Sequence, residues 1–332
     1  MQLWGGEVSE RIEITLPRGE FAEFTVACHD AAEGWAEAGI IKDAGDDPDV
    51  THGCLVRSRV RASGTGRVTF VAGEGIGIVT RPGLPVPPGE PAINPVPRQM
   101  MKAVVKELAA EFGRGEGVEI TLSIPGGRDI AQKTWNPRLG ITGGLSVLGT
   151  TGIVRPFSCS AWIASIHRGI DVARAAGLGH VAGATGATSE RAVQSLYGLA
   201  DHAMLDMGDF AGGLLKYLRA HPVAHVTIGG GVGKLTKLAQ GAVDLHSSRS
   251  RVDFAALGRV SVKAGLADVT KVNTALEAFE IAGPPLADEI AGRALEQVRK
   301  ILRNAPVSAD IVMVDRGGEI IAKAGQPPEG KP

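Results

Sequence analysis

The sequence is poor in the residues that build disulfides and metal clusters. Its 332 residues include three cysteines, Cys28, Cys54 and Cys159, which lie far apart and are odd in number. This arrangement argues against a disulfide framework and against a CxxC metal site, and it favours a reducing compartment. The eight histidines form neither HxH nor HExxH, so we expect no catalytic metal.

Long apolar runs and an excess of one charge are lacking as well. Lysine and arginine total 35 residues against 36 for aspartate and glutamate, so no field of the whole protein attracts nucleic acid or an anionic membrane. The uncharged run at 140–154 is rich in glycine and threonine and is shorter than the ~20 residues of a membrane span. The N-terminal residues lack the basic and apolar regions of a secretory signal. We therefore expect a cytoplasmic protein without a membrane or nucleic-acid partner.

The first part of the chain has the pattern of an α+β domain. A length of 332 residues, 44% of them apolar, suggests two domains. Short β-type runs between residues 11 and 80, separated by Gly, Pro and Asp, predict a mostly antiparallel sheet. Apolar residues at helical spacing from Met101 to Phe112 predict a helix that ends at Gly113, and the strand VEITLSI follows. We place this N-terminal domain at residues 1–133.

The second part alternates between strand and helix patterns. The runs LSVLG, HVAGA, AMLDM and HVTIG are typical of strands, and each precedes a helical stretch, at 160–176, 188–198, 209–220 and 231–240. Such alternation predicts a Rossmann-like parallel-sheet domain at 134–325, with C-terminal helices and a hairpin that turns at Gly317 and Gly318. A polar tail at 326–332 is predicted to be disordered. The expected fold class is α/β plus α+β.

Four glycine-rich loops follow the predicted strands of the second part. Glycine allows backbone N–H groups to approach an anion or a flat ring closely, and threonine adds hydroxyl groups. Because the carboxyl ends of parallel strands meet at one edge of a sheet, the loops together predict a nucleotide-like ligand. A glycine in any single loop also has a purely steric explanation. The loops are LGTTGIV (148–154), GATGATSE (183–190), DMGDF (206–210) and GGGVGK (229–234).

The standard nucleotide fingerprints are broken. Ile228 occupies the first glycine position of GxxxxGK[ST], and Leu235 replaces the Ser/Thr that binds Mg²⁺. No GxGxxG is followed by an acidic residue about twenty positions on, so neither ATP nor NAD is the expected ligand. Asp206 and Asp209 lie at a strand end, where carboxylates can accept hydrogen bonds from ribose hydroxyls. A solvated acidic loop is an interpretation of equal weight.

Two charged clusters are candidates for chemistry. The acidic loop KDAGDDPDVTHG (42–53) has the composition of a cation site or of a general base, and a solvated turn is its alternative. Basic residues near the glycine-rich loops favour a polyanionic substrate, and exposed surface cations are the alternative for any one of them. No nucleophile elbow supports covalent catalysis. The acidic loop contains Asp43, Asp46, Asp47, Asp49 and His52, and the basic set is Arg138, Arg155, Lys234, Lys237, His246, Arg249 and Arg251.

Four long runs together resemble the cobalt-precorrin-5B C1-methyltransferase family (CbiD) of corrin-ring biosynthesis. The resemblance extends from about residue 11 to the C-terminal region, and it implies S-adenosylmethionine-dependent methylation of C1 of cobalt-precorrin-5B to give cobalt-precorrin-6A. It also implies a fold unlike the common methyltransferase classes, which accounts for the missing fingerprint. The runs are KDAGDDPDVTHG, GIGIVTRPGLPVPPGEPAINPVPR, TWNPRLGITGGLSVLGTTGIVRP and DLHSSRSRVD.

The resemblance also assigns expected roles to the residues. Glycine-rich loops hold S-adenosylmethionine, the basic set neutralises the acetate and propionate groups of the tetrapyrrole substrate, and the acidic loop removes a ring proton. No metal is expected, and a homo-oligomer is one of the assemblies that the sequence allows. The expected cofactor contacts are Thr150, Thr151, Gly152, Gly183, Gly186, Asp206, Asp209, Gly229 and Gly231. The expected substrate contacts are Arg138, Arg155, Lys234, His246, Arg249 and Arg251, and the expected base is among Asp43, Asp47, Asp49 and His52.

One departure from the family pattern produces a second hypothesis. Family chains open with a segment like GYTTGTCAAAA, and nothing similar precedes the first strand of this sequence. We expect either a misassigned start or the loss of a piece of the active site. The alternative to the methyltransferase is therefore a non-catalytic protein that binds corrin intermediates. A nucleotide-dependent enzyme of another class is a third hypothesis, against which the broken fingerprints argue.

Overall fold

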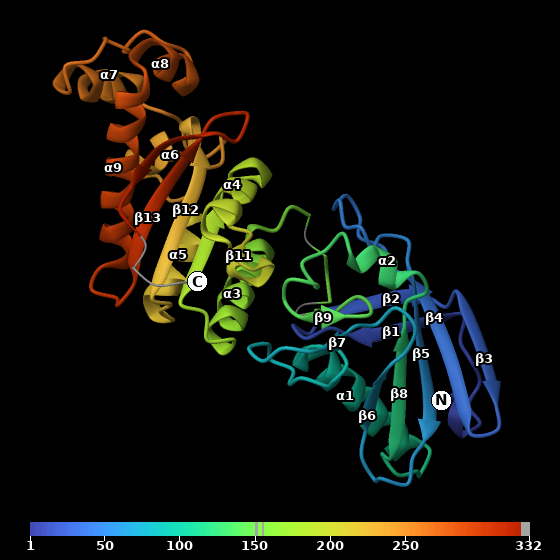
Figure 1. The fold of residues 1–332 in the computed structure, drawn as a ribbon. Helices are drawn as coiled ribbons and strands as arrows, with labels where there is room; N and C mark the ends of the chain where they lie inside the picture. Colours follow the sequence, from blue (N-terminus) through green and yellow to red (C-terminus); the bar gives the residue numbers. More distant parts are fainter. Residues whose placement is uncertain (150–151, 155, 327–332) are drawn as a thin grey trace. The chain divides into compact units, whose positions relative to one another are not determined.

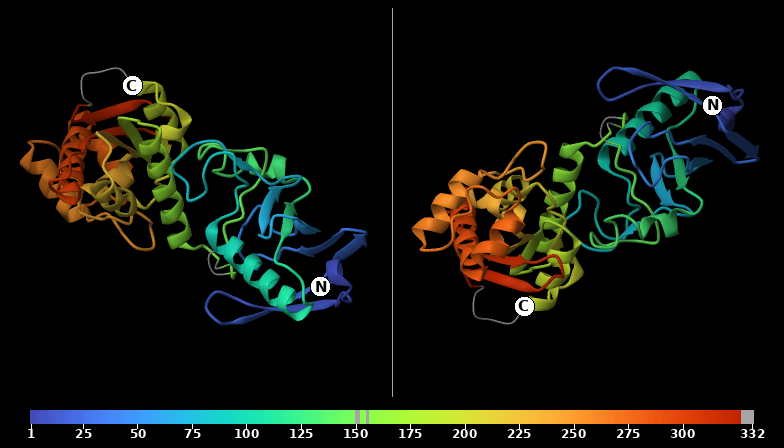
Figure 2. Two further views of the ribbon diagram at one scale, coloured as in Figure 1. Left: turned by 90° about the horizontal axis from the view of Figure 1, so that it is seen from below. Right: turned by 90° about the horizontal axis from the view of Figure 1, so that it is seen from above.

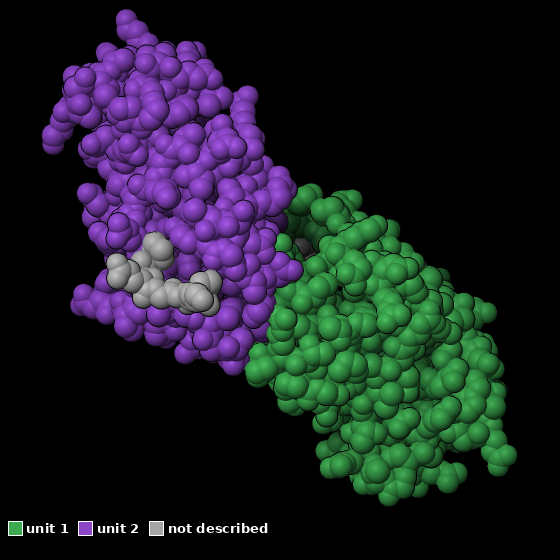
Figure 3. Space-filling view, in the orientation of Figure 1, with its two compact units in different colours: residues 1–158 green, residues 159–332 purple. Residues whose placement is uncertain are grey.

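A computed structural model describes residues 1–149, 152–154 and 156–326. The chain divides into two compact units, residues 1–158 (green in Figure 3) and residues 159–332 (purple). The division differs from the predicted boundary after residue 133, because β9 (Ile141–Thr142) pairs antiparallel with β7 (Ile78–Val79) inside the first unit.

The predicted strand LSVLG is wrong as the first strand of the parallel sheet. Leu145 and Val147 make only single bridges, to Ile76 and Ile93 of the first unit. Leu145 is buried in that unit's core together with Ile76 and Ile93. A short apolar run between glycines has a β-like local pattern, but the pattern does not identify the partner strand.

The main sheet of the first unit has the strand order β3-β4-β5-β8-β6 (Figure 1). Its pairings are antiparallel except for the parallel pair β6 and β8, which confirms the prediction of a mostly antiparallel sheet. A separate hairpin pairs β1 (Arg11–Thr15) with β2 (Phe21–Thr25). The strands of the main sheet are β3 (Cys28–Ala32), β4 (Trp35–Ile41), β5 (Leu55–Ala62), β6 (Thr69–Ala72) and β8 (Val118–Ser123).

Helix α1 (Pro95–Glu111) covers one face of this sheet. It begins at a proline after Asn94, where a missing N–H costs nothing, and it is followed by Gly113 with φ +59°. Its buried residues are Pro97, Val105 and Ala109, and Val105 shares a core with Ile120 and Leu122 of β8. The helix therefore lies where the apolar spacing predicted it. Short helices η1 (Gln2–Trp4) and α2 (Gly127–Ala131) complete the described part of this unit.

The second unit contains a sheet of strand order β11-β10-β12-β13-β14 (Figure 1). The first four strands are parallel and β14 is antiparallel, so the mixed α/β character that was predicted is confirmed. The strands are β10 (His180–Ala184), β11 (Met204–Leu205), β12 (His225–Gly231), β13 (Ser308–Val314) and β14 (Ile320–Ala324). The helices are α3 (Cys159–Ala175), α4 (Ala187–Tyr197), η2 (Asp201–Ala203), α5 (Ala211–Ala220), α6 (Val232–Ala239), α7 (Phe254–Lys263), α8 (Ala275–Ala282) and α9 (Pro284–Leu302).

Helices cover both faces of the second sheet (Figures 1 and 2). Helix α4 packs on the face that carries Ala182 and Val312, while α5, α6 and α9 pack on the face that carries Ile228 and Ile311. Val226 and Ile228 in the central strand are fully buried, as expected for a parallel strand covered on both faces. No described helix is both long enough and apolar enough to cross a membrane.

Candidate functional site

The carboxyl ends of three neighbouring parallel strands carry the glycine-rich loops that the sequence analysis selected. We call this region the carboxyl edge and define it as residues 185–190 and 206–210, which follow β10 and β11, and residues 229–234, which include the end of β12 (His225–Gly231). Helices α4, α5 and α6 begin here at Gly186, Phe210 and Gly231, and none of these N-caps makes a side-chain hydrogen bond. Helices α7 and α8, by contrast, are capped by Asp253 and Thr274. In α5 the first-turn N–H of Gly212 donates to the carbonyl oxygen of Val243 at 2.8 Å, while the N-caps of α4 and α6 leave their first-turn N–H groups without a side-chain acceptor.

Lys234 connects the three loops of the carboxyl edge. Its Nζ lies 2.7 Å from Oδ1 of Asp209 and donates to the carbonyl oxygen of Thr185 at 3.1 Å. One side chain on α6 therefore holds the loops after β10 and β11. The sequence analysis gave Asp209 to the cofactor and Lys234 to the substrate, whereas the structure brings the two together as an ion pair.

Four of the glycines expected to contact the cofactor, at the ends of β10 and β12, fall into two groups. A Cβ at Gly183 would lie 2.6 Å from Leu214, and a Cβ at Gly229 would lie 2.6 Å from Val193, so close packing already explains both glycines. A Cβ at Gly186 would meet nothing within 4 Å, and one at Gly231 would meet only a carbonyl oxygen at 3.9 Å. Of the four, Gly186 and Gly231 are the ones whose backbone borders open space.

The segment at 150–155 contributes little that the structure describes. Thr150, Thr151 and Arg155 lie outside the described residues. Gly152 belongs to the first unit, where its φ of +79° and the approach of Leu16 to within 2.5 Å of a built Cβ require glycine. Its glycine is explained by backbone conformation and packing.

The carboxylates of the acidic loop are engaged within the first unit. Lys42 donates to both Asp49 and Thr51, and Thr51 donates to Asp49. Burial raises the pKa of Asp49, but these hydrogen bonds outweigh burial and hold the pKa below its ordinary value. A carboxylate stabilised in its charged form is a weak proton acceptor, so Asp49 is a poor general base.

The other candidate bases also support the loop itself. Oδ1 of Asp43 accepts from the backbone N–H of Gly45 at 2.8 Å, and Oδ1 of Asp47 accepts from the N–H of Phe157 at 2.9 Å. Nδ1 of His52 accepts from the N–H of Ala44 at 3.1 Å, so the neutral ring carries its proton on Nε2. Of these side chains, Asp43 is the most exposed, at 84%.

The predicted basic residues are spread over several places. Arg138 stacks on Trp135 in the first unit, with 4.5 Å between the guanidinium carbon and the ring centroid. His246 bonds through Nδ1 to Ser248 at 2.7 Å, and Arg251 is exposed. Lys237 donates to the carbonyl oxygen of Leu245 at 2.9 Å.

Arg249 lies in a groove of about 460 Å³ on the second unit, formed largely by α3 and α5. It pairs with Asp244 at 2.9 Å and contacts Sγ of Cys159 at 3.3 Å. The groove is lined mainly by apolar side chains, together with the cations Lys216 and Arg249 and the carboxylate of Asp244. Its lining includes Cys159, Ile163, Phe210, Lys216, Val243 and Arg249.

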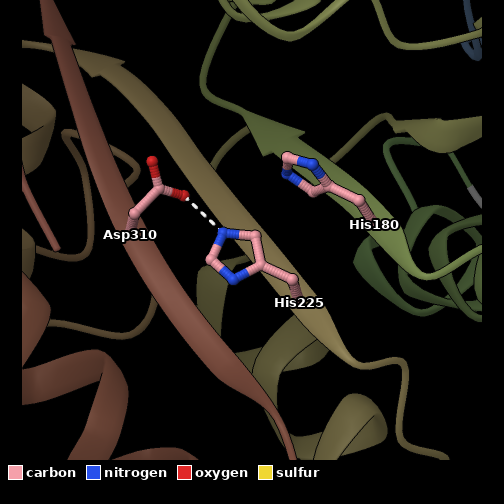
Figure 4. A group of neighbouring side chains, drawn as sticks. All are labelled: His180, His225 and Asp310. Atoms are coloured by element: carbon pink, nitrogen blue, oxygen red, sulfur yellow. Dashed lines mark hydrogen bonds and ion pairs between the residues drawn. The ribbon is translucent and has the colours of Figure 1, made fainter. Parts of the chain in front are cut away.

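A polar cluster that the sequence analysis missed lies at the other end of the same sheet (Figure 4). His225 and Ser308 are first residues of paired strands, as is His180. Nε2 of His225 lies 2.9 Å from Oδ1 of Asp310, and Nε2 of His180 lies 2.8 Å from Oγ1 of Thr227. The cluster is therefore at the amino ends of the strands and is separate from the carboxyl edge.

Burial controls the protonation of this cluster. Burial, followed by the nearby His225, lowers the pKa of His180 to about 4, so His180 is neutral at pH 7. Burial raises the pKa of Asp310, but hydrogen bonds from His225, Thr227 and Tyr197 outweigh burial and keep the carboxylate charged. Burial and the bond to Asp310 raise the pKa of Tyr197 well above 10. The hydroxyl of Tyr197 is thus a permanent donor to Asp310.

The two histidines and the aspartate also have the composition of a metal site. Their ligand atoms lie within 4.8 Å of one another. Each side chain already has a hydrogen-bond partner, and His225 and Asp310 are no more than 1% exposed. The cluster is satisfied by its own members, which is the arrangement expected of a buried structural network.

Comparisons with known proteins identify the family of this chain. A family model described as CbiD matches residues 1–156, and a model described as CbiD, C-terminal domain, matches residues 244–325. A cobalt-precorrin-5B C(1)-methyltransferase from Brucella anthropi is 58% identical over 328 residues, which is 96% of this chain and 89% of the relative. The chain belongs to the CbiD family. Relatives of the same description from Brucella canis and Brucella suis are 57% identical with the same coverage.

The CbiD matches leave a gap that contains the carboxyl edge. The first match ends two residues before the end of the first unit, and the second begins after α6, so residues 157–243 lie in neither. A crystal structure of a cobalamin biosynthesis protein (cbiD) from Archaeoglobus fulgidus aligns with 93% of this chain and 79% of that chain. It does so at 19% identity and a TM-score of 0.37.

Proposed function

We propose that this CbiD-family chain transfers a methyl group from S-adenosylmethionine to C1 of cobalt-precorrin-5B, giving cobalt-precorrin-6A in cobalamin biosynthesis. The observation that carries the proposal is an identity of 57–58% across 96% of the chain to relatives described as cobalt-precorrin-5B C(1)-methyltransferases. The protein acts in the cytoplasm, on a tetrapyrrole substrate.

The carboxyl edge is the part of the second unit that fits the methyl donor, and this unit serves as a Rossmann-like domain. S-adenosylmethionine supplies the methyl group, and its adenosine part needs a surface for a flat ring and partners for two ribose hydroxyls. Gly186 and Gly231 border open space at helix N-termini without side-chain caps, and Asp206 follows β11 directly. Backbone N–H groups and carboxylates at strand ends are the partners that nucleosides use in open α/β sheets.

The anionic substrate requires cationic side chains that remain accessible even where they form ion pairs within the protein. Arg249 is 57% exposed in its pair with Asp244, and Lys216 lines the same groove. We propose that this groove neutralises acetate and propionate groups of the tetrapyrrole, together with His246. Asp43, whose side chain is 84% exposed, is the proposed acceptor of the ring proton.

Mass spectrometry tests the proposed reaction. Purified protein incubated with S-adenosylmethionine and cobalt-precorrin-5B is expected to yield a product heavier by one methyl group. The Brucella anthropi relative is the positive control. No mass shift from this chain, while the relative turns over, would sink the proposal. Tetrapyrrole binding without any S-adenosylmethionine heat in calorimetry would instead support a non-catalytic binding protein.

A pair of glycine variants tests the location of the donor site. Gly186→Glu places a side chain where a Cβ meets nothing within 4 Å, so it should fold normally and block the approach of a ligand to the backbone. We expect the KM for S-adenosylmethionine to rise about tenfold or more. Gly179→Glu, at the amino end of the same strand and equally open, is the control and should leave KM unchanged. Equal effects of the two variants would remove the carboxyl edge as the donor site.

A further inference from the structure

Trp162 is fixed at the carboxyl edge by a single well-formed hydrogen bond. It lies in the first turn of α3, and its Nε1 donates to the carbonyl oxygen of Asp206 at 2.9 Å. Asp206 is the residue directly after β11. The indole is thereby held beside the end of a parallel strand, although α3 itself runs along the outside of the sheet.

The loop after β11 lies against one side of the indole. Gly208 has a φ of +52°, and a Cβ built on it would lie 3.2 Å from Cζ2 of Trp162. Only glycine combines this backbone conformation with so close an approach. The ring of Phe210 is 6.0 Å away and tilted by 55°. The indole is therefore seated on the loop and cannot rotate freely.

Trp162 nevertheless remains 45% exposed. Burial of an aromatic ring is strongly favourable, and an immobilised ring with an accessible surface is a preformed partner for another flat ring. The backbone N–H of Gly208 donates to the carbonyl oxygen of Ala184 at 3.0 Å. The loop that seats Trp162 thus adjoins the end of β10, where Gly186 opens the edge to solvent.

We propose that Trp162 is the stacking platform for the adenine ring of the methyl donor. The inference rests on the proposed function and extends it to one side chain that recognises the purine. Stacking on the indole holds the base near β11, within the loop that contains Asp206 and Asp209, which suit ribose hydroxyls. Stacking on an aromatic side chain requires a flat π-surface on the ligand. The purine of the methyl donor has such a surface and its methionine part has none, so Trp162 recognises the adenosine part.

Tryptophan fluorescence gives a direct measurement, because Trp162 is the one tryptophan of the second unit. The other three, Trp4, Trp35 and Trp135, belong to the first unit. Titration of the wild-type chain with S-adenosylmethionine or with adenosine should quench its emission in a saturable manner. Methionine, which lacks the purine, should not quench it.

Two substitutions and one control separate stacking from a structural role. Trp162→Phe keeps an aromatic ring and should lose the quenching while it retains most of the affinity. Trp162→Ala should weaken S-adenosylmethionine binding by roughly 5- to 100-fold in calorimetry. It should raise KM for the donor and change kcat little. Trp135→Phe, in the first unit, should retain both quenching and affinity.

Each outcome decides the inference. Quenching that persists in Trp162→Phe, or full affinity in Trp162→Ala, overturns the platform while methyl transfer by the wild type leaves the proposed function intact. Absence of both donor binding and methyl transfer in the wild type overturns the proposed function and the platform with it. If Trp162→Ala does not fold, as judged by circular dichroism, the fluorescence of Trp162→Phe decides alone.

Discussion

The change Tyr197→Phe removes one hydroxyl from the buried cluster at the amino ends of the second sheet. The Tyr197 hydroxyl donates to Oδ2 of Asp310, while His225 and Thr227 bond to Oδ1. Phenylalanine keeps the ring beside His180 but leaves one oxygen of a carboxylate that is 1% exposed without this donor. A hydrogen bond to a buried charged group contributes about 1.5–3 kcal/mol. We expect the free energy of unfolding of the second unit to fall by about 2 kcal/mol.

Tyr217→Phe is the matched control for this measurement. The Tyr217 hydroxyl donates to Oδ1 of Asp171 at 2.8 Å, and Arg168 also pairs with Asp171 at 2.9 Å. The Asp171 side chain is 16% exposed, so water can replace the lost hydroxyl, and we expect a loss of about 0.5–1 kcal/mol. Urea unfolding followed by circular dichroism compares the two variants in the transition of the second unit. If Tyr197→Phe is no more destabilising than Tyr217→Phe, the buried network is not the strong element inferred from its geometry.

Two further predictions concern the same unit. His180 has a folded-state pKa of about 4, below its ordinary 6.5, so the unfolded chain binds the proton first and stability falls as the pH drops from 6.5 to 4. His180→Gln can still donate to Thr227. It should reduce the loss of unfolding free energy between pH 6.5 and pH 4 by about 1–2 kcal/mol, after allowance for partial exposure, as measured by unfolding across that pH range. At the carboxyl edge, Lys234→Met and Asp209→Asn should each raise KM for S-adenosylmethionine. A double-mutant cycle on unfolding should give a coupling of about 0.5–1.5 kcal/mol, whereas strict additivity would deny that the pair acts as a unit.

Local patterns predicted the elements whose apolar spacing is long and regular. Helices α3, α4, α5 and α6 and the hairpin of β13 and β14 lie where the sequence patterns placed them. Helix α8, with the sequence ALEAFEIA, is apolar around much of its surface and short, so it has no clear face for a pattern to reveal. Leu145 was assigned to the wrong sheet because strand pairing depends on residues far along the chain.

For the candidate site, too, local sequence patterns predicted some features, whereas features that depend on contacts between distant residues were not predicted. Glycines after strands predicted the position of the carboxyl edge, since strand ends and turns are local features. The separate needs of Gly183 for packing and of Gly186 for an open backbone became distinguishable only from the neighbours of each. The contact of Trp162 with Asp206 spans 44 residues, and that of His225 with Asp310 spans 85. No spacing rule connects residues at such separations, so both escaped the sequence analysis.

The two outer strands of the second sheet restrict how this unit can associate with other chains. Strand β11 is two residues long and offers few unpaired backbone groups to an incoming strand. Strand β14 runs antiparallel to β13, contains a register shift beside Val314 and carries the exposed Lys323. Short edges, irregular pairing and lysine all oppose the addition of strands from another molecule. The unit is therefore protected against edge-to-edge aggregation while its strand ends stay open to small ligands.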